Sequence, residues 1–173
     1  MKNLAKVCLF AFALVPTLAI SQQPAGSLPP VPPALSAAKT VFLSNAGADS
    51  GLFPQPFSGD PNRAYTQLYS ALQASNAFQL VDAPSEADLV AELQLIAPYG
   101  PTNANKQYGA ADPRPMFRLT VYDRRTHYIL WTVTQSVDLA FLQKTHDHNF
   151  DLALTAVLDQ FLAIAGKAPV PAH

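Results

Sequence analysis

The chain has 173 residues, of which 49% are hydrophobic and 13% are charged, and its formal net charge is −1 at pH 7. This length fits one domain with a core of its own. The charges form no clustered basic face, which argues against a nucleic-acid partner. Cys8 is the only cysteine in the sequence, so an exported chain without it can hold neither a disulfide nor a thiolate metal site.

Residues 1–21 have the pattern of a secretory signal peptide. Lys2 and Lys6 precede an apolar run, and small residues at the end of the segment supply a cleavage site near Ser21. The apolar run is broken at Pro16 and is too short for a membrane-spanning helix, which needs about 20 residues. We therefore expect a protein that is periplasmic or secreted after cleavage, without a transmembrane span.

Cleavage would also change the charge and the anchoring of the chain. It removes two lysines and no acidic residue, so the net charge falls from −1 to −3. Cys8 lies well upstream of the cleavage site, whereas a lipoprotein cysteine has to be the first mature residue. We therefore expect no lipid anchor.

Four segments are expected along the chain. They are a signal peptide at 1–21, a Pro-rich disordered tether at 22–38, a single globular α/β domain at 39–166 and a frayed tail at 167–173. The tether carries five prolines, whose rings favour an extended polyproline conformation.

Hydrophobic periodicity and turn residues predict the elements of the domain. In chain order these are a strand at 39–44, a long loop at 45–59, a helix capped by Asp60 with Pro61 at its first position and ending near Ser75-Asn76, a strand at 78–81, a turn at 84–87, a strand at 89–96, a loop at 98–113, strands at 116–122 and 128–137 joined by a hairpin turn, and a helix that begins around 147–149 and ends at Ala165 before Gly166.

This order of elements predicts an α/β (α+β) fold. We expect a single, mostly antiparallel sheet of about five strands with two main helices packed on one face. The last helix carries an apolar stripe that includes Phe150, Leu154 and Leu158, which would be its core-facing side.

His146-Asp147-His148 is the segment that invites a metal-site interpretation, since imidazole and carboxylate bind zinc and copper. Asp147 and Asn149 are also favoured at helix starts, and capping explains the local composition by itself. We therefore expect no metal site. In the alternative, a metal would be bound by His146 and His148. No cofactor is expected, because the glycines follow no phosphate-binding or dinucleotide-binding spacing.

Two aromatic features remain as candidates for binding a partner. The loop at 45–59 carries Leu52, Phe53 and Phe57, which must either fold back over the core or present an apolar patch. We favour the fold-back. Trp131 lies in the middle of an alternating strand, where core packing is the usual role and a place at a groove is the alternative.

Two motifs resemble a known group of proteins. The sequence EADLVAEL at 86–93 and the sequence FRLTVYDRRTHYILW at 117–131 look like the strand entry and hairpin of a broad group of bacterial envelope proteins. This group includes the amino-terminal domain of TolB, the curlin-secretion protein CsgG and LpoB-like penicillin-binding-protein activators. The resemblance implies a periplasmic α/β domain that docks other envelope components, and it supplies no catalytic residues. The chain departs from the lipoprotein members by lacking the lipidated cysteine.

The function expected from the sequence is therefore that of an exported, non-enzymatic domain that binds a protein or another envelope component. Enzyme activity stays open, because a small hydrolase or ligand-binding protein could use the cleft between loops 45–59 and 98–113. A nucleophilic serine in a G-x-S-x-G turn is absent from the sequence. A purely structural envelope component is the third alternative.

Overall fold

The computed structural model describes residues 29–98 and 114–168. The chain divides into two compact units, 1–30 and 31–173, and every helix and strand described lies in the second. The expected signal peptide, almost all of the loop at 98–113 and most of the expected tail lie outside the described residues.

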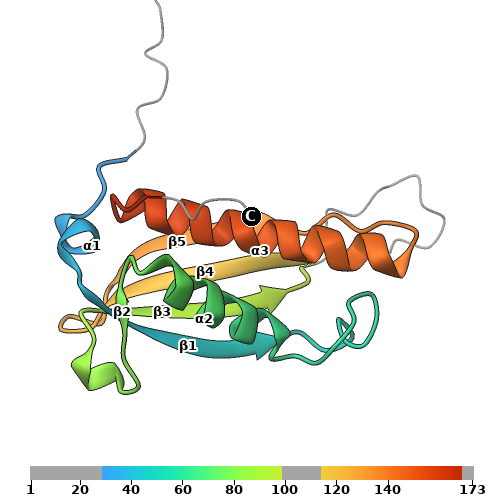
Figure 1. The fold of residues 1–173 in the computed structure, drawn as a ribbon, viewed down its shortest axis with the longest axis horizontal. Helices are drawn as coiled ribbons and strands as arrows, with labels where there is room; N and C mark the ends of the chain where they lie inside the picture. Colours follow the sequence, from blue (N-terminus) through green and yellow to red (C-terminus); the bar gives the residue numbers. More distant parts are fainter. Residues whose placement is uncertain (1–28, 99–113, 169–173) are drawn as a thin grey trace, which may run out of the picture. The chain divides into compact units, whose positions relative to one another are not determined.

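A five-stranded sheet forms the centre of the second unit. The elements are α1 (Pro33–Ala37), β1 (Thr40–Ala48), α2 (Arg63–Ser75), β2 (Gln79–Leu80), the 3₁₀ turn η1 (Pro84–Glu86), β3 (Leu89–Ile96), β4 (Met116–Asp123), β5 (Ile129–Ser136) and α3 (Gln143–Ile164). The strand order is β2-β1-β3-β4-β5, with β1 parallel to β2 and β3 and with β4 antiparallel to both of its neighbours. Helices α2 and α3 cover one face of the sheet (Figure 1), so the predicted fold class is confirmed.

The core lies between the sheet and the two long helices. Alternate residues of β3 are buried, from Leu89 to Leu95, because successive side chains of a strand point to opposite faces. Helix α3 contributes Phe150, Val157 and Phe161, all fully buried. Burial of these side chains is the main driving force that holds the helices on the sheet.

Both long helices end where the sequence predicts. Asn76, the C-cap of α2, has a left-handed backbone with φ 52°, a conformation that asparagine tolerates better than most residues. Gly166 follows the C-cap of α3 with φ 66°, and its N–H donates to Ala163 O at 3.0 Å.

The two helix starts differ from the prediction. Helix α2 begins at Arg63, because Asp60 and Pro61 form a turn in which the Asn62 N–H donates to Asp60 Oδ1 at 2.7 Å. Helix α3 begins at Gln143, about one turn before the predicted start. Contacts with a distant loop, described below, hold this extra turn, and no local capping signal marks it.

Two further segments are more ordered than expected. Strand β1 continues past Ser44 to Ala48, with a register shift against β3 that Gly47 accommodates at φ 78°. The last part of the expected tether, Pro33–Ala37, is helix α1, and its Leu35 is fully buried. Proline at the first helical position and one apolar anchor explain why these residues are ordered despite their composition.

Candidate partner-binding site

The loop between β1 and α2 folds back onto the core. Leu52 and Phe57 are buried and Phe53 is half-buried. The Phe57 ring lies 5.1 Å from the Phe150 ring of α3, which in turn lies 4.9 Å from the Phe117 ring of β4. Distances of this size are typical of packed aromatic pairs. Leu52 and Phe57 are therefore core residues and offer no exposed surface to a partner.

Trp131 is also half-buried and packs against the core, on the helix-covered side of β5. It pairs across the strands with buried Val121. The structure thus brings three of the four sequence candidates, Leu52, Phe53 and Phe57, together at the start of α3 and leaves Trp131 on β5.

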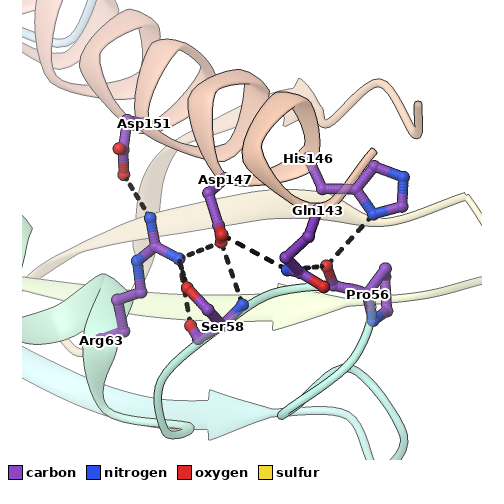
Figure 2. Close-up of polar contacts among 7 residues, drawn as sticks. All are labelled: Pro56, Ser58, Arg63, Gln143, His146, Asp147 and Asp151. Carbon is purple, nitrogen blue, oxygen red and sulfur yellow. Dashed lines mark hydrogen bonds and ion pairs between the residues drawn. The ribbon is translucent and has the colours of Figure 1, made fainter. Parts of the chain in front are cut away.

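A charged contact fixes the folded-back loop to α3. Arg63 Nη1 lies 2.5 Å from Asp147 Oδ1 and Arg63 Nη2 lies 2.8 Å from Asp151 Oδ1. Nη1 also donates to Ser58 O at 3.0 Å, and the guanidinium carbon lies 4.3 Å above the Phe150 ring. Figure 2 shows Arg63 reaching across from α2 to both aspartates of α3. This arginine joins the loop, α2 and α3 in one contact.

Asp147 is the most strongly perturbed acid of this contact. Burial raises the pKa of its carboxyl, but hydrogen bonds from the Ser58 N–H, the Arg63 guanidinium and the Gln143 amide outweigh burial. Together they lower the pKa from its ordinary value of 3.8 to about 2. Asp147 therefore acts as a structural anion inside α3 and does not cap the helix start as the sequence suggested.

His146 joins two loops at the start of α3. Its Nδ1 lies 3.1 Å from Pro56 O, and its Nε2 contacts the carbonyl oxygen of Ala140. Gln143 Nε2 donates to the same Pro56 oxygen at 2.6 Å (Figure 2). Both ring nitrogens of His146 are thus directed at carbonyl oxygens.

His146 and His148 do not converge on a common point. They are two positions apart on a helix, where neighbours on one face are three or four apart, and His148 is exposed. Within 29–98 and 114–168 no group of three or more His, Cys, Asp or Glu residues is arranged to hold a metal ion.

The loop that follows β5 presents apolar side chains on the outside. This segment comprises residues 138–142 and is called the 138–142 loop below. Leu139 is 45% exposed, Phe141 is 101% exposed and Leu142 is 64% exposed. Large apolar side chains that gather at the surface are typical of interaction sites. A hollow of about 280 Å³, lined in part by Leu139 and Asp138, adjoins the loop.

The backbone of the 138–142 loop is held at both ends. At its start, the Val137 N–H donates to Pro115 O at 2.8 Å, and Asn149 Nδ2 donates to Asp138 O at 2.8 Å. In its middle, His146 contacts Ala140 O, and at its end Leu142 O accepts the N–H groups of Thr145 and His146, both at 3.0 Å. The side chains of Leu139 and Phe141 are therefore exposed on a fixed backbone.

The sequence patterns do not identify this loop, which lies between a strand predicted to end at residue 137 and a helix predicted to start near 147. The sequence nevertheless contains a pattern that could have marked the loop. Leu139, Phe141 and Leu142 place three large apolar residues within four positions of an expected loop. Such residues either pack on the core or form an exposed surface that binds a partner.

The cleft proposed for a hydrolase cannot be traced, because its second wall, the loop at 98–113, falls almost wholly outside the described residues. Helices long and apolar enough to cross a membrane are not found among the residues described.

Comparison with known proteins gives structural similarity only. The chain matches no family model and no curated protein.

Among solved structures it is similar to a PelC dodecamer from Paraburkholderia phytofirmans, with 12% identity and a TM-score of 0.41 over 75% of this chain and 88% of that one. It is also similar to the LpoB C-terminal domain from Salmonella enterica, with 15% identity and a TM-score of 0.38 over 60% of this chain and 85% of that one. A third similar structure is an uncharacterized lipoprotein B from Nitrosomonas europaea, with 10% identity and a TM-score of 0.39 over 82% of this chain and 91% of that one. LpoB is one of the proteins named by the sequence resemblance, and at these identities and TM-scores the similarity supports no inference about function.

Proposed function

We propose that this chain is an exported, non-enzymatic domain that binds a protein of the cell envelope through the 138–142 loop. The observation that carries the proposal is the complete exposure of Phe141 on a loop whose backbone is hydrogen-bonded in place. Aromatic side chains of this kind are the usual anchors of protein interfaces, because they bury a large area in a partner's pocket.

Preorganisation supports the binding role. A flexible loop loses conformational entropy when a partner orders it, and that loss weakens binding. Here one hydrogen bond from Asn149 and the contact from His146 hold the backbone beforehand. Leu139 and Leu142 flank Phe141 and would exclude water from its contact with the partner.

The export part of the proposal rests on residues 1–21. Their basic start, apolar run and small residues are the pattern of a cleaved signal peptide. The mature protein would begin near Gln22 in the periplasm or outside the cell, and mass spectrometry of the exported product measures that start directly.

Site-specific photo-crosslinking tests the binding surface. A photoreactive phenylalanine analogue replaces Phe141 in the full chain, and a matched protein carries it at Thr155, an exposed position of α3. We expect a discrete crosslinked protein in envelope fractions from position 141 and none from position 155. Equal crosslinking at the two positions, or none at 141, would contradict the proposal.

A further inference from the structure

A basic groove lies at the other end of β5 from the 138–142 loop. It has a volume of about 530 Å³, within the range of about 300–1,000 Å³ usual for ligand pockets. The side chains that line it are Pro84, Ser85, Val90, Arg124, Arg125 and His127. The β4–β5 turn thus supplies two guanidinium groups and an imidazole, while η1 and β3 supply the remaining wall. The lining contains no carboxylate.

Arg124 is held in a defined position beside this groove. Its Nε donates to Ala87 O at 3.2 Å, and its backbone N–H donates to Asp88 O at 3.3 Å. Among the residues described, its two terminal nitrogens have no hydrogen-bond acceptor, and the ion pairs found are those of Arg63. The forked end of a half-buried arginine is therefore fixed and still free to donate.

The carboxylates nearest to the turn are already used by backbone groups. Asp123 Oδ1 accepts the N–H groups of Arg125 and Thr126 at 2.7 and 2.9 Å. Asp88 Oδ2 accepts the N–H groups of Lys39 and Thr40 at 2.8 and 3.1 Å. Neither acid lines the groove, but both line the adjoining hollow together with Arg125, whose positive charge helps these hydrogen bonds to lower the pKa of each carboxyl. Arg124 is therefore the guanidinium group of the groove that no carboxylate of the described residues approaches in an ion pair.

We propose that this groove binds an acidic polypeptide segment. Carboxylates of the segment would accept hydrogen bonds from Arg124 and Arg125, since the guanidinium fork matches a carboxylate in two-point geometry. Val90 and Pro84 would contact the aliphatic parts of the same side chains. The apolar contact offered by Pro84 and Val90 beside the two arginines favours the side chains of a polypeptide over lipid headgroups. The site is separate from the 138–142 loop, so it stands whether or not Phe141 contacts a partner.

Fluorescence anisotropy with two labelled peptides tests the proposal on the purified exported protein. One peptide consists of consecutive aspartates, and the matched peptide has asparagines in their place. We expect the acidic peptide to bind and the neutral one not to bind, with affinity for the acidic peptide falling as salt is added because exposed charges are screened.

Variants locate the binding in the groove. Losing both charged contacts in Arg124→Gln/Arg125→Gln should weaken binding about tenfold. Arg125→Gln alone changes an exposed side chain, leaves the Arg124 contact with Ala87 in place, and should weaken binding about threefold. Arg118→Gln removes the same charge from an exposed position of β4 outside the groove and should change binding little.

Several outcomes would overturn the proposal. These are no binding of the acidic peptide, equal binding of both peptides, or a loss in Arg118→Gln as large as in Arg125→Gln. Vesicles containing phosphatidylglycerol provide a further arm. Binding to vesicles that the double variant loses, without binding of the peptide, would assign the groove to lipid headgroups and contradict the proposal.

Discussion

Arg63 is the residue that joins the folded-back loop, α2 and α3 most directly. Its side chain is 15% exposed and contacts Ser58, Asp147, Asp151 and the Phe150 ring. Removing one partner of a mostly buried ion pair costs more than the pair itself contributes, because the remaining charge is left without compensation.

Arg63→Met tests this role because it keeps most of the side-chain volume and removes the charge. We expect the free energy of unfolding to fall by about 2 kcal/mol, because charge-assisted hydrogen bonds are lost at a partly buried site. Urea unfolding measures it. Arg118→Met, at an exposed position of β4, is the control and should change stability by less than about 0.5 kcal/mol. Equal losses would mean that the Arg63 contacts do not stabilise the fold.

The stability that the contact between Arg63 and Asp147 contributes depends on pH, because Asp147 must be ionised. Its pKa in the folded protein is about 2, below the ordinary value of 3.8 expected in the unfolded chain. A carboxyl with a lowered folded-state pKa contributes stability that is fully present above the unfolded value and is lost as the pH falls through the folded value.

The Asp147→Asn variant should therefore be less sensitive to acid than the wild type. We expect the wild type to lose more stability between pH 4 and pH 2 than the variant loses, with urea midpoints measured at both pH values. A variant with the same acid sensitivity as the wild type would show that Asp147 is not stabilised as an anion.

At the scale of elements, α3 has one face in the core and another in solvent. Leu158 is 3% exposed and Leu152 is 56% exposed. The same substitution at the two positions therefore separates packing from helix propensity, since leucine to alanine changes the propensity by the same amount in both.

Leu158→Ala should lower the free energy of unfolding by about 2–5 kcal/mol, because it removes buried methyl groups and leaves a cavity. Leu152→Ala should change it by less than about 0.5 kcal/mol. Thermal or urea unfolding of the pair gives the comparison. Similar losses in both variants would mean that the buried and exposed faces of α3 are assigned wrongly.

The elements that the sequence predicts well are those with regular patterns of their own. The alternation in β3 and the apolar stripe of α3 follow directly from which side chains the core buries. Asn76 and Gly166 mark helix ends through their backbone conformations, which few other residues adopt. Periodicity and local conformation are therefore enough to predict the fold class.

The helix start and the partner-binding site depend on contacts that sequence patterns do not carry. The first turn of α3 is held by Gln143 and His146 on Pro56, which lies almost ninety positions earlier in the chain. The capping interpretation of Asp147 was wrong for the same reason, because its partners are Ser58 in a distant loop and Arg63 at the start of α2. Long-range pairs of this kind leave no local signal in one sequence.

In the whole molecule, two surfaces of different chemistry lie at the two ends of β5. The apolar 138–142 loop follows the end of β5, and the basic groove includes the turn before its start. In Figure 1, β5 lies behind α3. The two proposed binding surfaces therefore adjoin opposite ends of the same strand.

Competition at position 141 tests whether Phe141 carries the binding of an envelope protein. The protein with the photoreactive analogue at Phe141 is crosslinked in envelope fractions while unlabelled wild-type protein or unlabelled Phe141→Ser protein is added in excess. Phe141 is fully exposed, so its replacement by serine should leave the melting temperature unchanged. We expect the wild type to suppress the crosslinked product and the Phe141→Ser protein not to suppress it. Equal suppression by both proteins would show that Phe141 does not carry the binding and would contradict the proposed function.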